Sequence, residues 1–501
     1  MRGLDYAWRQ RTARLAQKRF HSFPPLAGKV YDYEFGAGYS RMYKRVSKKS
    51  FCLRVFTIIV LSMAIGLQTT ADQAVEGGPS SASSDSVLTP SAEEAEPTKE
   101  NSIVGESAKE ELEVEVGEVA EGSMEKQGLS WRYGLRYETE SGQFRLRLGG
   151  LFQYDGAFFE EGSDLSNADD GSEFRRARLV VEGALGKHGE FRVQYDFTDK
   201  EGSESIDDLW VSVKNLPRLG RVKLGYFKES FGLENLTSSR DTTFMERALP
   251  GAFVPGRNLG VAFSNAVIDN RATWALGLFR DTSSKLDVDS ESAMVTGRVT
   301  GLPWYREDGE KLLHLGAGFS YRKLDKSNFS YGRRPEAHLA PRYLDTGGFV
   351  VNDLYLVNAE LALVHGAFSF QSEYFYSNAQ SDAGRDVEFG GIYAQASYFI
   401  TGEHRPYKKS AGTFDKVSPN RNFFLGGVQG PGAWEVAIRY SRIDLDDADI
   451  MGGREHNITA AVNWYLNPNA RIMFNYVYGD IDSPSGDDEF HAFQGRLQIA
   501  F

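Results

Sequence analysis

The stretch ESFGLENLTSSRDTTFMERALPGAFVPGRN, residues 229–258, decides how the rest of the chain is interpreted. Segments of alternating polar and apolar residues flank it, RVKLGYF before it and LGVAFS after it. The stretch itself has no period of two, and connections this long between strands are usually functional or disordered. Its apolar side chains, among them Phe231, Phe244 and Phe253, argue against disorder in water. The sequence therefore predicts a connection that packs against the rest of the protein.

We expect this connection to fold into the interior of a barrel formed by the flanking strands, where it would narrow the pore. That arrangement would place Arg240, Arg247 and Arg257 in the permeation path. Two alternatives remain open: the connection lies over the barrel mouth, or it packs against a neighbouring subunit. Arg240, in the polar run TSSRDTT, is expected to be free, although Asp241 could offset its charge, whereas Arg247 and Arg257 are candidates for ties that hold the loop.

Composition limits the class of protein. Lys and Arg number 57 against 69 Asp and Glu, so nucleic acid is not expected as a partner. A mean hydropathy of -0.41 argues against a membrane protein built of many helices. The 52 Gly, 24 Tyr and 33 Phe favour strands joined by tight turns. The single cysteine, Cys52, excludes an intramolecular disulfide and a cysteine-based zinc site, and no cofactor is expected.

The first 128 residues differ from the remainder. Residues 1–71 are predicted to be an N-terminal extension and export signal, because the apolar run FCLRVFTIIVLSMAIGL follows a basic flank. Met42 as the true start, and a signal anchor that stays attached, remain open. Residues 72–128 are acidic and lack aromatic residues, so they cannot bury enough apolar surface to fold and are predicted to be a disordered linker.

Residues 129–501 alternate apolar and polar residues to the end of the chain. Phe144, Leu146 and Leu148 share one face of a strand, while Arg145 and Arg147 share the other. Strands of about ten residues with aromatic groups near both ends are typical of transmembrane barrels. The fold class is therefore predicted to be all-β, a sixteen-stranded antiparallel transmembrane barrel, with strands at 144–158, 173–185, 189–198, 205–214, 221–227, 257–265, 271–280, 291–301, 311–322, 353–365, 367–377, 388–400, 432–443, 454–466, 469–479 and 489–501.

The connections between these strands differ in length. Short ones such as GKHG (186–189), HGA (365–367) and LNPN (466–469) are predicted to be periplasmic turns. The long segments 323–352 and 401–431 are predicted to be external loops. The second of them is basic, which suggests either attraction of anions to the mouth or contact with lipopolysaccharide.

The last strand ends in GRLQIAF, with an aromatic residue, Phe501, at the terminus. Such an ending resembles the signal by which outer-membrane barrels are recognised for assembly, so Phe501 is predicted to be an assembly signal read by the barrel-assembly machinery.

Four stretches resemble one family, the phosphate-selective porins of Gram-negative outer membranes (porin O and P type). They are RLRLGGLFQYDGAFF, EFRRARLVVEGALGKHGEFRVQYDF, RVKLGYFKESFGLENLTSSRDTTFMERALPGAFVPGRNLGV and YFITGEHRPYKK. The resemblance covers roughly residues 130–501. It implies a homotrimeric porin in the outer membrane, in contact with lipid and lipopolysaccharide, with a constricting loop and a path for anions lined by arginine and lysine.

Alternation places an excess of basic side chains on the polar, lumen-facing side of the first strands. A net positive wall favours anions, and the planar fork of Arg can bind two phosphate oxygens at once. Some pairs of Arg and Asp are expected simply to neutralise each other. The predicted lumen-wall residues are Arg145, Arg147, Arg176, Arg178, Arg192, Arg221 and Lys223.

The predicted function is a porin for small anions, phosphate or polyphosphate. A general, weakly selective porin and a structural anchor barrel are the alternatives. An enzyme is not expected, because the histidines form no HxxH or HExxH pair, and His314 and Ser320 on one predicted face lie about 20 Å apart along the strand.

Overall fold

The computed structural model describes residues 128–131, 134–161, 168–198, 205–282, 286, 288, 292–381, 385–423, 430–484 and 486–501. The predicted export signal (1–71) and, apart from Gly128, the predicted linker (72–128) lie outside these residues. Among the described residues, no helix is both long enough and apolar enough to cross a membrane.

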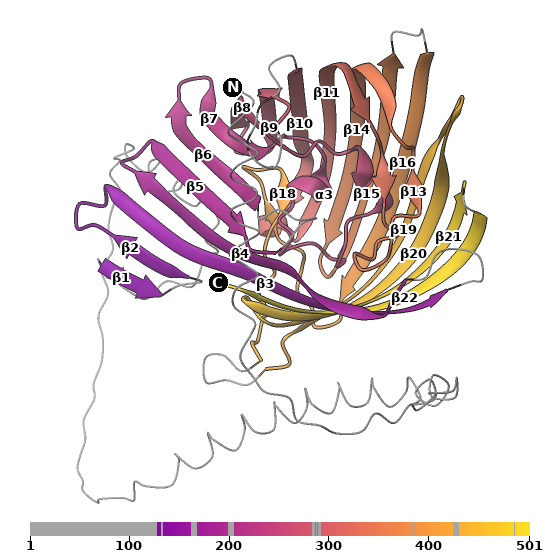
Figure 1. The fold of residues 1–501 in the computed structure, drawn as a ribbon. Helices are drawn as coiled ribbons and strands as arrows, with labels where there is room; N and C mark the ends of the chain where they lie inside the picture. The colour runs from indigo at the N-terminus through magenta and orange to yellow at the C-terminus, as the bar shows by residue number, and fades with distance from the viewer. Residues whose placement is uncertain are drawn as a thin grey trace, which may run out of the picture. The chain divides into compact units, whose positions relative to one another are not determined.

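A closed antiparallel barrel makes up most of the described chain (Figure 1). Each strand pairs with the next one along the chain, and the last strand, β22, pairs with the first barrel strand, β3. The sixteen barrel strands are β3 (Phe144–Glu161), β4 (Gly171–Leu185), β5 (Gly189–Asp196), β6 (Ser205–Leu216), β7 (Gly220–Lys228), β8 (Arg257–Val267), β9 (Ala272–Arg280), β10 (Ala293–Arg306), β11 (Lys311–Phe329), β14 (Phe349–His365), β15 (Phe368–Ser381), β16 (Arg385–Phe399), β19 (Ala433–Asp447), β20 (Ile450–Asn467), β21 (Ala470–Ser483) and β22 (Gly486–Ala500).

The predicted number of strands and their positions are confirmed. As expected, the alternation of polar and apolar residues determines which side of each strand faces the lumen and which side faces outward. Along β20, Glu455, Asn457 and Thr459 are buried in the lumen, while Ile458 and Val462 on the opposite face are exposed. An exposed apolar band on the outside of a closed barrel is the surface that a lipid bilayer covers, and closure satisfies every strand edge within that bilayer.

A short hairpin precedes the barrel. Strand β1 (Gly128–Trp131) pairs with β2 (Leu135–Glu138), and β2 pairs with the start of β3 at the point where β22 ends. Phe501 closes this junction, because its backbone N–H and carbonyl both bond to Gly150. The ring of Phe501 lies 6.1 Å from the rings of Trp131 and Phe152.

The connections fall alternately at the two ends of the barrel. We call the end that carries the turns β4–β5, β14–β15 and β20–β21 the periplasmic end and the opposite end the outer end. The connection between β7 and β8 (229–256, the constriction loop) and that between β11 and β14 (330–348, the second loop) both lie at the outer end. The second loop includes the two-residue strands β12 (Gly332–Arg333) and β13 (Leu344–Asp345).

The prediction that residues 401–431 form an external loop is wrong. They connect β16 to β19, and the order of strands puts this connection at the periplasmic end, with the short turns. Connection length misled the prediction, because the described residues of this segment include a hairpin that is packed inside the barrel. This hairpin consists of β17 (Tyr407–Lys408) and β18 (Thr413–Phe414), and it packs against the barrel wall and the constriction loop. We call residues 400–432 the periplasmic insertion.

The constriction loop folds into the barrel, as predicted. It contains a short helix, α3 (Leu233–Leu236), and a 3-10 helix, η3 (Leu249–Phe253). The carboxylate of Glu373 on β15 accepts the N–H groups of Leu233 and Glu234 at 2.7 and 2.8 Å. Farther along, Arg471 on β21 donates to the carbonyl of Thr242 at 2.8 Å. The loop therefore crosses the lumen to the opposite wall.

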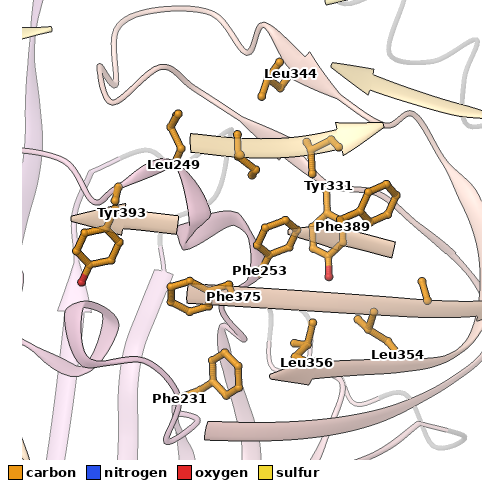
Figure 2. Close-up of a cluster of buried hydrophobic side chains, with 14 of the residues drawn as sticks. Phe231, Leu249, Phe253, Tyr331, Leu344, Leu354, Leu356, Phe375, Phe389 and Tyr393 are labelled. Carbon is orange, nitrogen blue, oxygen red and sulfur yellow. The ribbon is translucent and has the colours of Figure 1, made fainter. Parts of the chain in front are cut away.

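Apolar side chains fasten the two inward loops to one side of the wall (Figure 2). Gly391 on β16 allows a close approach of the constriction loop, because a Cβ there would lie 2.8 Å from Cγ of Pro250. Much of this cluster lies along β14–β16, and among the described residues the cluster has no buried member on β4, β5 or β6. Its labelled members are Phe231, Leu249 and Phe253 of the constriction loop, Tyr331 and Leu344 of the second loop, and Leu354, Leu356, Phe375, Phe389 and Tyr393 of the wall.

Candidate functional site

A cavity of about 230 Å³ lies between the start of β4, the end of β7 and the two inward loops. Its side chains are strongly biased in charge, with six basic groups and one carboxylate. The cavity is lined by Arg175, Arg176, Lys228, Asn235, Glu246, Arg247, Gly251, Val254, Pro255, Gly256, Arg257 and Arg333.

Two of the cations come from the wall and form no ion pair among the described residues. The guanidinium of Arg176 donates to the side-chain carbonyl of Gln153 at 2.6 Å, and its Nε has no hydrogen-bond partner although the side chain is buried. Lys228 donates one of its three protons to the carbonyl of Asn235 at 2.7 Å. Both groups therefore retain donors that the protein does not satisfy.

Two more cations come from the loops and are held by backbone carbonyls. Arg247 donates to the carbonyls of Glu234, Asn235 and Thr237 at 3.2–3.3 Å. Arg333 of the second loop donates to the carbonyl of Arg247 at 2.7 Å. Neutral carbonyls orient these guanidinium groups without cancelling their charge.

The remaining two basic groups of the cavity are paired. Arg175 forms a two-pronged bond to Glu246 at 2.9 and 3.0 Å. Arg257 binds Asp208 at 3.0 Å and lies 3.6 Å from Asp207. Since these acids neutralise only part of the charge, the cavity has a net positive field.

The pKa values of the loop residues fit this field. Burial alone would raise the pKa of the Glu246 carboxyl, but Arg175 and Arg176 outweigh it and hold that pKa well below its usual range. Burial lowers the pKa of Arg247 and of Arg333, which means that each guanidinium carries its charge at a desolvation cost. An anion in the cavity would offset that cost.

Toward the periplasmic end, the wall of β4–β7 arranges its charges in two layers. The guanidinium of Arg221 is 34% exposed, whereas its partner Glu190 is 4% exposed. Arg178 is 12% exposed and its partner Asp196 is fully buried. The carboxylates therefore lie behind and position the arginines, which face the lumen. Arginines and carboxylates do pair, as predicted, but the groups nearest the water in the lumen are the positively charged arginines.

The structure places the predicted site residues as follows. Arg247 and Arg257 line the cavity, as does Arg176. Arg240 instead pairs with its neighbour Asp241 at 3.2 Å, outside the cavity. Lys223 stacks on the ring of Trp210 at 4.5 Å. The remaining predicted wall residues lie on the lumen strands, with Arg147 and Arg192 both bonded to Glu182, Arg178 and Arg221 paired as above, and Arg145 at the start of β3.

Sequence reasoning missed three cations of the cavity: Arg175, Lys228 and Arg333. Arg175 sits at a bulge, where the register between β3 and β4 shifts and Arg175 has no partner opposite it. A bulge breaks strict alternation, so Arg175 and Arg176 can both face inward. Lys228 ends its strand and Arg333 lies in a loop, so period-two patterning could not assign either.

Polar contacts join the periplasmic insertion to the wall. Arg298 on β10 holds Glu360 at 2.7 and 2.8 Å and donates to the carbonyl of Gly412 at 2.8 Å. His314 bonds to Tyr407 of the insertion at 2.6 Å. Arg405 stacks on Phe414 at 3.6 Å and donates to Gln371. Phe414 in turn packs with Leu233 of the constriction loop, so the two inward segments meet.

The described residues include no cluster of three or more metal-ligating side chains. What the cavity offers is hydrogen-bond donors and positive charge on a lumen wall. A closed barrel of sixteen strands with an inward constriction loop defines an outer-membrane porin.

Comparison with known proteins narrows the class. The family model described as Phosphate-selective porin O and P matches residues 145–501, and the chain belongs to this family. It is similar to Porin O of Pseudomonas aeruginosa, with 28% identity over 414 residues, 74% of this chain and 91% of that protein. It is also similar to an uncharacterized protein of Caulobacter vibrioides, with 30% identity over 328 residues, 62% of this chain and 63% of that one.

Solved structures with a similar chain path include a porin and an outer membrane channel. An anion-selective porin from Comamonas acidovorans aligns with a TM-score of 0.46 at 14% identity, covering 72% of this chain and 100% of its own. The outer membrane channel DcaP of Acinetobacter baumannii aligns with a TM-score of 0.46 at 12% identity, covering 73% and 99%.

Proposed function

We propose that this porin conducts phosphate and polyphosphate across the outer membrane through the cavity beside the constriction loop. The observation that carries the proposal is the set of four cations without an ion-pair partner among the described residues: Arg176, Lys228, Arg247 and Arg333. Planar guanidinium forks suit tetrahedral oxyanions because they bind two oxygens at once. Membership of the phosphate-selective porin family supports the same choice.

The path for anions continues along the two-layered wall. Anions would pass from Arg257, which lines the cavity, to further basic residues nearer the periplasmic end. These residues are Arg240, Arg178, Arg192, Arg221 and Lys223. Arg145 and Arg147, at the start of β3, would form the exit. Binding must be strong enough to draw anions in and divided among several sites so that they leave again.

The experiment is inhibition of chloride current by phosphate in planar bilayers. Phosphate that occupies the cavity should reduce the chloride current of the full-length protein in a saturable way. Arg176→Gln and Arg247→Gln should each weaken this inhibition by about tenfold, the effect of losing one charged hydrogen bond of 1.4 kcal/mol. Lys311→Gln removes an exposed cation paired with Glu307 at a turn and is the matched control. If phosphate does not inhibit the chloride current of the wild type, the proposal is wrong and the protein is a general, weakly selective porin.

The protein acts as a passive channel in this proposal and not as an enzyme, because the cavity offers fixed charge rather than a nucleophile beside a base. We infer a homotrimer in contact with lipid and lipopolysaccharide, which is inserted by the barrel-assembly machinery and has no nucleic-acid partner. A structural anchor barrel is the competing function, and it predicts no open-channel conductance at all.

A further inference from the structure

Glu246 is the one carboxylate among the described residues that line the cavity. It comes from the constriction loop, and its side chain is 14% exposed, so it reaches the cavity surface rather than being enclosed. A negative group in a site built to attract anions weakens the attraction for every anion that cannot bond to it. The presence of Glu246 in the cavity is therefore not explained by the attraction of anions to positive charge.

We propose that Glu246 selects anions that carry an O–H group, so that hydrogen phosphate is preferred to sulfate at neutral pH, and phosphate monoesters are preferred only at acidic pH, where they keep a proton. This proposal rests on the anion path through the cavity described above, and it names the class of anion that the path takes.

The hydrogen bonds of Glu246 leave one acceptor position open. Its Oε1 accepts from Nε of Arg175 and from Nη2 of Arg496, both at 2.9 Å. Its Oε2 accepts from Nη2 of Arg175 at 3.0 Å. A carboxylate has about four lone-pair positions, two on each oxygen. Oε2 can therefore accept one more hydrogen bond, and an O–H group of a bound anion can supply it.

Glu246 is ionised under neutral and mildly acidic conditions. Burial opposes ionisation, but Arg175 and Arg176 hold the pKa of the carboxyl well below its usual range. An ionised carboxylate only accepts hydrogen bonds, so it can bond to an anion solely through a proton that the anion carries. The same two arginines prevent Glu246 from taking that proton itself.

The chemistry of the anions then separates them. Inorganic phosphate keeps at least one proton throughout the neutral range, whereas sulfate keeps none. Hydrogen phosphate can donate to Glu246 while its other oxygens accept from Arg176, Lys228 or Arg333. Sulfate would meet the carboxylate with an unprotonated oxygen, which leaves two negative groups in contact. Sites that bond to a ligand hydroxyl reject analogues that lack it far more strongly than apolar sites reject a missing methylene.

The competing explanation is that Glu246 only ties Arg175 and Arg496 in place. A tie would affect binding of all anions alike, because loosened arginines serve phosphate and sulfate equally. The ratio of the two affinities is therefore the diagnostic measurement, and the absolute affinity is not.

The first test compares Glu246→Gln with the wild type in the full-length protein. Inhibition constants of phosphate and of sulfate are measured on the chloride current at pH 7. We expect the preference for phosphate over sulfate to fall at least about tenfold in Glu246→Gln, since the amide can donate to sulfate. Glu182→Gln, which removes a carboxylate paired with Arg147 and Arg192 outside the cavity, should leave the ratio unchanged. An unchanged ratio in Glu246→Gln overturns the proposal.

The second test needs no variant and holds even if Glu246→Gln does not assemble. At pH 5, dihydrogen phosphate, methyl phosphate and dimethyl phosphate are all singly charged, but only the first two carry an O–H group. We expect dimethyl phosphate to inhibit at least about tenfold more weakly than methyl phosphate in the wild type. Equal inhibition by the two esters overturns the proposal.

Methyl phosphate itself serves as the control for the size of the anion. Its second proton dissociates with a pKa of about 6, so at pH 8 the same molecule has no O–H group. Its inhibition relative to hydrogen phosphate should therefore weaken between pH 5 and pH 8, and a constant ratio contradicts the role of Glu246. A wild type that phosphate does not inhibit at all refutes the proposed function itself, which is a different outcome from inhibition that ignores the O–H group.

Discussion

Arg496 of β22 and Asp155 of β3 lie directly opposite each other across the strand pair that closes the barrel, joined by two hydrogen bonds of 2.7 and 2.6 Å. The same guanidinium donates to the carbonyl of Met245 and to Glu246. One buried side chain thus joins the seam of the barrel to the constriction loop.

The first prediction concerns this pair. Asp155→Asn should destabilise the barrel, but by less than the about 3–5 kcal/mol that follows when a buried charge loses its only partner, because Glu246 still pairs with Arg496. The urea midpoint of the assembled barrel measures the loss. Lys311→Ala, which breaks an exposed ion pair, should change stability by less than about 1 kcal/mol. Equal midpoints for Asp155→Asn and the wild type would show that the seam does not depend on this contact.

The second prediction separates the three arginines of the constriction-loop region. Arg257→Gln should shift the reversal potential toward cations most strongly, because it removes a cation that lines the cavity and leaves Asp207 and Asp208 with one basic partner fewer. Arg240→Gln should shift it least, since Arg240 does not line the cavity. Arg247→Gln should also increase current noise, because three loop carbonyls lose their donor. Reversal potentials across a tenfold salt gradient test this order, and three identical potentials refute it.

The third prediction is a pH effect at Lys416 of the periplasmic insertion. Burial, with Arg240 nearby, lowers the pKa of the Lys416 amine to about 8. The amine is therefore charged at pH 7 and mostly neutral at pH 9, so anion selectivity should fall between these values. Lys416→Met should have the lower selectivity already at pH 7 and lose this part of the pH dependence. If Lys416→Met shows the same dependence of anion selectivity on pH as the wild type, the titrating group is not Lys416.

The same shift has a consequence for stability with a defined sign. In the unfolded chain the Lys416 amine keeps its proton up to about pH 10.4. Between about pH 8 and pH 10.4 the unfolded state binds more protons than the folded state, so this group's contribution to folding becomes more favourable as the pH rises.

The fourth prediction concerns Phe501. Its removal should lower the amount of barrel in the outer membrane at low expression, both because it matches the assembly signal and because it closes the junction at Gly150. Trp131→Ala removes a ring that packs on Phe501 but keeps the C-terminal residue, so it separates the two causes. A loss that occurs only without Phe501 indicates the signal, an equal loss in both variants indicates packing, and no loss in either contradicts the assignment.

The fifth prediction concerns the periplasmic insertion. Arg298→Gln should release the hairpin β17–β18, because the two-pronged bond to Glu360 and the bond to the Gly412 carbonyl are lost together. Trypsin should then cut more rapidly at Lys408 or Lys409, and open-channel conductance should rise. Tyr407→Phe removes only the bond to His314 and should have a smaller effect in the same direction. Unchanged cleavage in Arg298→Gln would mean that other contacts hold the insertion.

The barrel itself could be predicted from sequence because lipid outside and polar groups inside impose a period of two on every strand. The inward loop could be predicted because Phe231, Phe244 and Phe253 needed cover, and all three are buried. The cavity could be predicted only in part. Arg176, Arg247 and Arg257 were found by alternation and by the unusual loop, whereas the bulge at Arg175 hides that residue from any periodic rule.

The position of residues 401–431 could not be predicted from the length of that connection alone. A long connection is an external loop only when its residues project from the outer end of the barrel. Here the hairpin β17–β18 of the insertion packs against the inside of the wall. Arg405 and Phe414 are buried, which shows that its basic and aromatic groups serve packing as well as charge.

The contact of Arg496 with the constriction loop also restricts the order in which the protein folds. The loop begins after β7, yet it bonds to residues of β3, β15, β20, β21 and β22. A loop threaded into a finished cylinder would have to find these partners in a confined space. If instead the sheet curls around a loop already in place, closing the seam and seating the loop become one cooperative step. A chain arrested before β22 would then have an unseated constriction as well as an open edge.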